Sequence, residues 1–287
     1  MKRFEPFLAE ERPDAVIVVG DVNSTVACAL TSVKMGIPVA HVEAGLRSFD
    51  RTMPEEINRV VTDAISQWLF VSEPSGVANL EREGIPAERI YFVGNVMIET
   101  LIACRKHFES ISLSDLRISS RNYAVLTLHR PSNVDDPVIL RGLLRAIDVI
   151  QRQIPVIFPV HPRTRKALAE QAVGLPNLQL IEPLGYFEFM KLVSDCRFVF
   201  TDSGGIQEET TYLGVPCLTL RKNTERPVTV DRGTNQLAGN DPDAIIAAVQ
   251  KTLSVDKLTR HIPLLWDGHA SVRILDVFEQ DHAKSSV

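Results

Sequence analysis

The chain contains 287 residues, which is enough for one large or two medium domains. Its hydrophobic content of 45% and formal net charge of -5 are typical of a globular protein and argue against a nucleic-acid or polyanion partner. Apolar runs reach only strand length, so no membrane span is expected. The first residues lack the apolar core of a secretory signal and the four cysteines lack CxxC spacing, so we expect a cytoplasmic protein with reduced thiols.

Strand-length apolar runs alternate with segments of helical periodicity through the first hundred residues. Because this rhythm requires a parallel sheet covered by helices, it predicts a doubly wound α/β domain. The predicted strands are 15–19, 38–42, 69–71 and 90–93, and the predicted helices are 24–35, 54–66 and 75–83.

A polar segment rich in serine and arginine, 104–122, interrupts this rhythm, and we interpret it as the connection to a second α/β domain. We therefore expect an N-terminal domain at 1–103, a nucleotide-binding domain at 104–269, and a final helix and tail at 270–287 that either returns to the first domain or covers the second. The second domain is predicted to have strands 124–128, 156–160, 178–181, 197–200 and 217–220 and helices 137–152, 164–171, 187–193 and 242–252, with the final helix at 270–278.

The segment 201–209, Thr-Asp-Ser-Gly-Gly-Ile-Gln-Glu-Glu, follows a predicted strand and begins a helix that ends at Gly214. Ser203 is in the N-cap position, and Gly204 and Gly205 let backbone N–H groups approach a ligand closely. A helix N-terminus of this kind is typical of phosphate sites. About one turn later, Glu209 offers a carboxylate to a ribose diol. The alternative is a tight turn followed by solvated acidic residues.

Polar side chains also follow other predicted strands at their carboxyl ends, where open α/β sheets bind ligands. Each could be a solvated loop residue, but together they predict an active cleft shared by two tandem domains. His41 and Glu43, at i and i+2, are expected on one face of their strand. The residues at the strand ends are Asp21, His41, Glu43, His129, His161 and Ser203.

Each of three arginines could either bind near a substrate or form part of the charged surface. Glu55 and Arg59 are four residues apart in a helix that begins at Pro54, which predicts an ion pair that is either a surface contact or orients a carboxylate toward substrate. Arg221 and Arg226 follow a strand and either bind a diphosphate or remain surface charges. No HExxH, GxGxxG, Walker or GxSxG motif is present, so a metal, a nicotinamide cofactor, an ATPase and a hydrolase triad are not supported.

Seven segments together closely resemble the non-hydrolysing UDP-N-acetylglucosamine 2-epimerases: 20–25, 41–48, 54–59, 128–130, 159–162, 201–209 and 224–227. The resemblance implies a glycosyltransferase-B-like fold of two Rossmann-like domains. It also implies a homodimer that interconverts UDP-N-acetylglucosamine and UDP-N-acetylmannosamine for cell-envelope polysaccharide precursors, without a cofactor, through elimination and re-addition of UDP. The same resemblance assigns roles at the sugar to Asp21, Glu43, Glu55, Arg59 and His129, and at UDP to Ser203, Gly204, Gly205 and Glu209. From their positions after strands, we expect further UDP contacts from His161, Arg221 and Arg226.

The family's opening strand and arginine-containing loop have no counterpart in this sequence, so residue 1 falls inside a helix of the first domain. We therefore expect an incomplete first domain and a poorly active chain whose second domain is intact. The alternatives are a glycosyltransferase of the same architecture, a hydrolysing epimerase that releases UDP, and a nucleotide-binding module without turnover.

Overall fold

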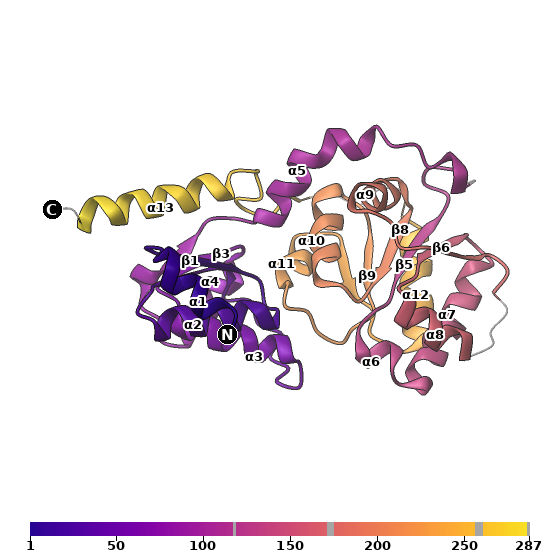
Figure 1. The fold of residues 1–287 in the computed structure, drawn as a ribbon. Coiled ribbons are helices and arrows are strands. Elements are labelled where there is room, and N and C mark those ends of the chain that lie inside the picture. The colour runs from indigo at the N-terminus through magenta and orange to yellow at the C-terminus, as the bar shows by residue number, and fades with distance from the viewer. Residues whose placement is uncertain (117–118, 171–174, 256–260, 286–287) are drawn as a thin grey trace. The chain divides into compact units, whose positions relative to one another are not determined.

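The computed structural model of the chain describes residues 1–116, 119–170, 175–255 and 261–285. Its contacts divide the chain into two compact units (Figure 1). Unit 1 comprises Met1–Thr100, Glu225–Val228 and Pro263–Val287, and unit 2 comprises Leu101–Thr224 and Thr229–Ile262. Two stretches from the second half of the sequence therefore belong to the N-terminal unit.

Unit 1 contains a parallel four-stranded sheet in the order β1-β2-β3-β4. The strands are β1 (Val16–Val19), β2 (Val39–Ala44), β3 (Trp68–Val71) and β4 (Ile90–Phe92). The helices are α1 (Phe4–Glu11), α2 (Asn23–Lys34), α3 (Pro54–Ile65) and α4 (Pro74–Arg82), with a 3₁₀ turn, η1 (Ala87–Arg89). Because all four strands run in the same direction, their carboxyl ends meet at one edge of the sheet, where ligands bind in open α/β sheets.

The C-terminal helix α13 (Ala270–Ser285) contributes to the core of this N-terminal sheet. Its Ile274 is buried, and Phe278 packs edge-on against Trp68 and Phe70, with ring centroids 5.2 Å and 5.6 Å apart. Trp68 Nε1 also donates a hydrogen bond of 2.6 Å to Asp281 Oδ2. Apolar packing and a partly buried hydrogen bond therefore hold α13 on unit 1.

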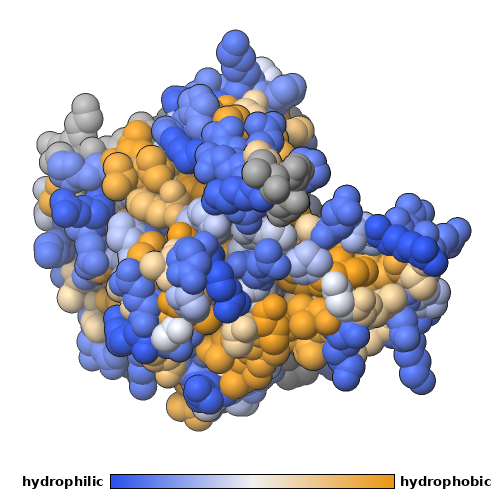
Figure 2. All heavy atoms as spheres, turned by 90° about the vertical axis from the view of Figure 1, so that its left-hand side faces the viewer, coloured by the Kyte–Doolittle hydropathy of each residue, from blue (hydrophilic) through white to orange (hydrophobic). Residues whose placement is uncertain are grey.

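The outer strand β1 presents apolar side chains to solvent. Ile17 is 53% exposed and Val19 is 51% exposed, and β1 pairs only with β2 among the described strands. Contiguous apolar surface is also visible between hydrophilic regions on the face shown in Figure 2.

Unit 2 contains a parallel six-stranded sheet in the order β10-β9-β8-β5-β6-β7. The strand order reverses between β5 and β8, and such a switch point is where doubly wound sheets bind ligands. The strands are β5 (Ala124–Thr127), β6 (Val156–Pro159), β7 (Leu178–Ile181), β8 (Phe198–Thr201), β9 (Cys217–Thr219) and β10 (Asn235–Leu237). The helices are α6 (Pro131–Val134), α7 (Pro137–Gln151), α8 (Pro162–Glu170), α9 (Tyr186–Asp195), α10 (Gly204–Leu213) and α12 (Pro242–Leu253), with η2 (Ser114–Leu116). Two more helices, α5 (Val96–Glu109) and α11 (Pro227–Asp231), begin in unit 1 and end in unit 2.

The predicted α/β class with parallel sheets is confirmed, but three details were wrong or missing. The segment at 104–122 is not wholly a connection, because its first residues complete α5, whose buried side chains include Ile98, Leu101 and Phe108 at helical spacing. The final helix extends past 278 to Ser285. The short elements α1, α6, α11 and β10 were not predicted. Residues 117–118, 171 and 286–287 of the predicted segments lie outside the described residues.

Candidate active site

Asp21 lies in the bend between β1 and α2, and α3 holds it in place. Arg59 Nη1 donates to Asp21 Oδ2, while Asn58 Nδ2 donates to the Asp21 carbonyl at 2.8 Å. Arg59 is only 1% exposed, whereas the Asp21 side chain keeps 30% of its surface exposed. The arrangement therefore offers an arginine-bound carboxylate to a ligand.

The second acid on the Arg59 guanidinium is Glu56, which corrects the sequence prediction. The spacing predicted Glu55 as the partner, but Glu56, three residues before Arg59, accepts hydrogen bonds of 3.1 Å from Nε and 2.7 Å from Nη2. Burial by itself raises the pKa of Glu56, but the backbone N–H of Ser48 and the Arg59 contacts more than offset this, so the pKa lies below its usual value. Arg59 thus lies between two carboxylates, and only Asp21 of these is substantially exposed.

Glu43 occupies a β-bulge at the end of β2. The pairing register with β3 shifts between Val42 and Ala44, and Glu43 has a φ of 70°. A non-glycine residue in this region of backbone space is strained, and bulges commonly redirect a side chain at a functional site. Its carboxylate accepts a hydrogen bond of 3.0 Å from Arg226 Nη2, which comes from the Glu225–Val228 stretch of unit 1. The bulge breaks the regular alternation on which the predicted common face of His41 and Glu43 depended.

His41 is fully buried, so its side chain presents no exposed surface to a ligand. Its Nδ1 lies 2.6 Å from Asp63 Oδ1 and its Nε2 lies 2.9 Å from the Gly20 carbonyl oxygen. Asp63 Oδ2 also accepts from Gly45 N at 3.0 Å and pairs with Arg47 Nη1 at 2.7 Å. Burial by itself lowers the pKa of His41, but the hydrogen bond and charge of Asp63 reverse the effect and raise the pKa above 6.5.

In unit 2, α10 begins directly after the carboxyl end of β8, with Ser203 as its N-cap residue and Gly204 and Gly205 in its first turn. The predicted N-cap position is therefore occupied, although the Ser203 side chain makes no capping hydrogen bond. The unpaired N–H groups of a first turn and the positive end of the helix dipole favour an anion at this position.

Glu209, on the second turn of α10, is only 4% exposed. Tyr186 Oη, at the start of α9, donates a hydrogen bond of 3.1 Å to Glu209 Oε1. Burial raises the pKa of Glu209 to about 7, against the smaller lowering effect of Tyr186. A carboxyl with this pKa accepts hydrogen bonds from a diol best above neutral pH.

His129 follows β5, next to the switch point of the sheet, and Asp202 orients it. His129 Nδ1 donates to Asp202 Oδ1 at 2.9 Å, and the backbone N–H groups of His129 and Arg130 also donate to this carboxylate. Burial alone raises the pKa of Asp202, but these donors lower it overall. Asp202 therefore stays ionised, which places a proton on His129 Nδ1 and leaves Nε2 to face a ligand on a side chain that is 51% exposed.

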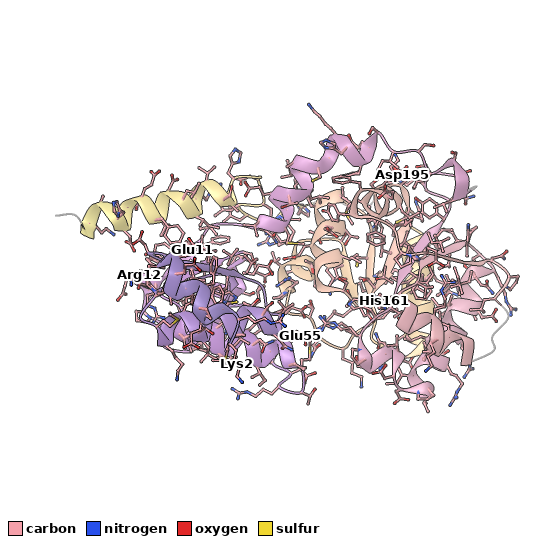
Figure 3. The ribbon with its side chains drawn as sticks, viewed as in Figure 1. Lys2, Glu11, Arg12, Glu55, His161 and Asp195 are labelled. Atoms are coloured by element: carbon pink, nitrogen blue, oxygen red, sulfur yellow. The ribbon has the colours of Figure 1, made fainter. Side chains whose placement is uncertain are left out.

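A pocket of 430 Å³ lies at the carboxyl ends of β5 and β6, and its lining includes Thr127, His129 and His161. His161 is exposed in the loop after β6 (Figure 3). Arg221 lies in the loop after β9, where it is 8% exposed and donates to Asn223 at 3.5 Å. The UDP-side residues assigned to unit 2 are thus distributed over the ends of β6, β8 and β9.

Comparison with known proteins identifies the family. The model of the UDP-N-acetylglucosamine 2-epimerase family matches residues 1–279. The chain is 44% identical over 274 residues to a UDP-N-acetylglucosamine 2-epimerase of Methanococcus maripaludis, covering 91% of this chain and 74% of that protein. The chain belongs to the UDP-N-acetylglucosamine 2-epimerase family.

Two further similar proteins are also sugar-nucleotide 2-epimerases. The crystal structure of the Methanocaldococcus jannaschii UDP-GlcNAc 2-epimerase in complex with UDP-GlcNAc and UDP is 41% identical, with a TM-score of 0.87 over 96% of this chain and 78% of that chain. A UDP-2,3-diacetamido-2,3-dideoxy-D-glucuronate 2-epimerase of Pseudomonas aeruginosa is 39% identical over 280 residues, covering 96% of this chain and 77% of that protein. The matches support the glycosyltransferase-B-like fold of two Rossmann-like domains, and an epimerase rather than a glycosyltransferase.

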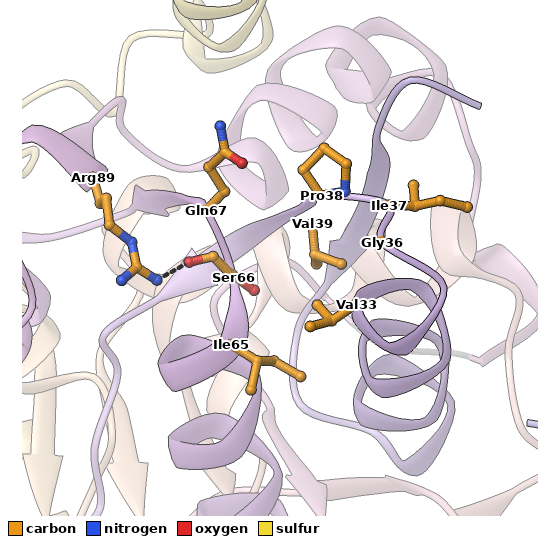
Figure 4. A pocket seen from close by; sticks show the side chains of 9 residues that line it. All are labelled: Val33, Gly36, Ile37, Pro38, Val39, Ile65, Ser66, Gln67 and Arg89. Atoms are coloured by element: carbon orange, nitrogen blue, oxygen red, sulfur yellow. Dashed lines mark hydrogen bonds between the residues drawn. The ribbon is translucent and has the colours of Figure 1, made fainter. Parts of the chain in front are cut away.

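Another pocket lies in unit 1, away from the strand ends of this epimerase that carry charged residues. It has a volume of 470 Å³ at the amino ends of β2 and β3, and its lining includes Val33, Val39 and Ile65 (Figure 4). Arg89 closes one side by donating to the Ser66 carbonyl. The pocket brings no carboxylate to its lining, so it offers no acid or base.

Across the described ranges, no group of three or more His, Cys, Asp or Glu side chains is arranged to hold a metal ion. None of the helices in the part of the chain that the structure describes is both long and apolar enough to cross a membrane.

The residues of this epimerase site that were not predicted include Glu56, Asp63, Tyr186 and Asp202. Asp202 lies within the segment 201–209, and its position directly after a strand was a signal of the same kind as that of Ser203. Asp63 and Glu56 follow helical spacing in α3, but nothing local shows that they are buried. No sequence signal relates Tyr186 to Glu209.

Proposed function

We propose that this epimerase interconverts UDP-N-acetylglucosamine and UDP-N-acetylmannosamine by eliminating UDP and adding it back. The observation that carries the proposal is a pair of carboxylates, Asp21 and Glu43, at the ends of neighbouring strands β1 and β2, each bound by its own arginine. Inversion at C2 requires a proton to leave one face of the sugar and to return on the other, and two acidic groups suit this exchange.

In the forward half-reaction, a carboxylate takes the C2 proton, the C1–O bond to the diphosphate breaks, and its electron pair leaves with UDP. The product is a glycal with a C1–C2 double bond. In the return half-reaction, a UDP oxygen bonds to C1 and a carboxyl group returns a proton to the opposite face of C2. Arg59 binds Asp21 and Arg226 binds Glu43, so each carboxylate is held in a defined position at its strand end. Glu55, at the start of α3 (Figure 3), is proposed as the third acid at the sugar.

The residues of unit 2 suit the departing nucleotide. The first turn of α10, at Ser203, Gly204 and Gly205, is proposed to bind the diphosphate, whose negative charge grows as the C1–O bond breaks. Glu209 is proposed to accept hydrogen bonds from the ribose hydroxyls. His129, oriented by Asp202, presents Nε2 as an acid or base toward the leaving oxygen. His161 and Arg221 of unit 2, and Arg226 of unit 1, are proposed as further contacts to UDP.

We also infer that this epimerase is a cytoplasmic homodimer that uses no cofactor and needs no nucleic-acid or membrane partner. Family resemblance, the mildly acidic charge and four free cysteines support this inference. Light scattering coupled to gel filtration tests the dimer, and a monomer across the micromolar range would contradict it.

Incubation of the purified chain with UDP-N-acetylglucosamine in D₂O, followed by proton NMR, tests the reaction. We expect UDP-N-acetylmannosamine to form with deuterium at C2, and turnover to fall by about 10²-fold or more in Asp21→Asn and Glu43→Gln. The matched control is Asp14→Asn, an exposed aspartate of unit 1. Free N-acetylmannosamine would indicate a hydrolysing enzyme, and UDP binding without turnover would indicate a binding module. Conversion of the 2,3-diacetamido glucuronate substrate alone would reassign the sugar.

A further inference from the structure

The hydrogen bonds around His41 specify its protonation state. Both ring nitrogens have partners, at 2.6 Å for Asp63 Oδ1 and 2.9 Å for the Gly20 carbonyl, and the side chain is fully buried. A carbonyl oxygen only accepts hydrogen bonds, so Nε2 must carry a proton. An ionised carboxylate also only accepts, so Nδ1 must carry one as well.

Asp63 is held in its ionised form by the donors on its other oxygen. Gly45 N donates to Oδ2, and the buried Arg47 guanidinium lies 2.7 Å from the same atom. Arg47 also pairs with Glu83 through two hydrogen bonds, of 2.8 Å and 2.7 Å. With His41 protonated, two cations and two carboxylates balance. A neutral His41 would leave the buried Asp63 carboxylate with Arg47 as its cation, and Arg47 is shared with Glu83, whose side chain is 36% exposed.

We propose that His41 is a permanently protonated positioning residue, which fixes the peptide before Asp21 and takes no part in proton transfer. Gly20 is bound by β2 on both sides, since its N–H donates to the Val42 carbonyl at 3.0 Å and its own carbonyl accepts from His41. Gly20 has a φ of 68°, so the chain turns sharply here and the next residue is Asp21.

The hydrogen bond from His41 to the Gly20 carbonyl complements the contacts that α3 makes with Asp21. Asn58 and Arg59 bind the carbonyl and the carboxylate of Asp21, whereas His41 binds the preceding peptide from β2. The charged groups that act on His41 are Asp63 from α3 and, more weakly, Glu43 from β2, with Arg47 beyond Asp63. Because both ring nitrogens are engaged and inaccessible, a proton on His41 has no route to a bound sugar.

Ring-nitrogen NMR of the ¹⁵N-histidine-labelled chain tests the charge without using activity. The chain has seven histidines, and His41→Gln identifies the His41 signals by their loss. We expect both ring nitrogens to show protonated shifts from pH 6 to pH 8.5 without titration. In Asp63→Asn, the amide at 63 donates to Nδ1, so we expect His41 to become neutral. An unprotonated nitrogen in the wild-type chain at pH 7 would overturn the proposal.

Kinetics test the positioning role, which rests on the proposed epimerase function. We expect His41→Gln to lower kcat by about 10²-fold with little change in KM, because a displaced Asp21 loses its alignment while UDP binding in unit 2 is kept. The matched control is His269→Gln, whose side chain is 68% exposed in unit 1. An unchanged kcat in His41→Gln would refute positioning. If the wild-type chain itself shows no epimerisation, the proposed function fails while the NMR result still decides the charge.

Discussion

Asparagine at position 63 is expected to destabilise unit 1 strongly. Asp63 is 1% exposed and accepts from His41, Gly45 and Arg47. Asparagine keeps the shape of the side chain but removes the charge, so the buried Arg47 guanidinium loses one of its two carboxylates. Removal of one partner from a buried ion pair costs about 3–5 kcal/mol. Partial relief comes from His41, which can release its Nδ1 proton.

Tryptophan fluorescence in urea reports this loss in unit 1 alone. The chain has two tryptophans, Trp68 and Trp266, and both are buried in unit 1. For a slope of about 2 kcal/mol per molar urea, a loss of 3–5 kcal/mol lowers the midpoint by about 1.5–2.5 M. The control, Asp14→Asn, changes an exposed aspartate of the same unit and should stay within about 0.5 kcal/mol of the wild type.

The pH dependence of the lost stability distinguishes the contribution of Asp63 from that of His41. The pKa of Asp63 is lowered in the folded chain, so its contribution is present at neutral pH and is lost only as the pH falls through the folded value. The pKa of His41 is raised, so its contribution is full below about 6.5 and is lost as the pH rises through the folded value. The deficit of His41→Gln should therefore shrink at high pH, and that of Asp63→Asn only in acid. An Asp63→Asn midpoint equal to that of Asp14→Asn would refute the reasoning.

Three further predictions concern the nucleotide, the bulge and the C-terminal segment. Glu209→Gln should weaken uridine binding by about tenfold at pH 8 and abolish its pH dependence, because the pKa of Glu209 is raised to about 7 and the wild-type carboxylate gains a proton below that value. Calorimetry at pH 6 and pH 8 checks this, and a variant that keeps the wild-type pH dependence would contradict it. Arg226→Met should lower kcat by about 10²-fold in the NMR assay, because the Glu43 carboxylate loses its hydrogen bond of 3.0 Å from Arg226. Wild-type turnover in this variant would show that the Arg226–Glu43 ion pair is dispensable. Gly94→Ala should lower the free energy of unfolding by about 1–3 kcal/mol more than Gly84→Ala, measured by tryptophan fluorescence in urea. Both glycines have positive φ, but only at Gly94 would an added Cβ meet a carbonyl oxygen, that of Leu265, at 2.1 Å. Equal losses in the two variants would exclude that contact.

Local patterns were sufficient for the α/β class and for most strands, because buried parallel strands are short apolar runs and the helices between them repeat every three to four residues. The same patterns placed Asp21, Ser203 and His129 after strands, and parallel strands necessarily bring such residues to one edge of their sheet. Resemblance to a family, carried by several spaced segments, then supplied the reaction.

The partners of these residues were decided only by the tertiary structure. Arg226 reaches Glu43 across 183 positions of sequence, and Trp68 reaches Asp281 across 213. Periodicity describes neighbours within an element, so it cannot show that Glu225–Val228 and Pro263–Val287 join the first unit. Burial also decides that Arg59 pairs with Glu56 and not with Glu55. The double protonation inferred for His41 depends on burial in the same way. Burial of that kind is a property of the packed chain, because it arises when separate elements cover one another.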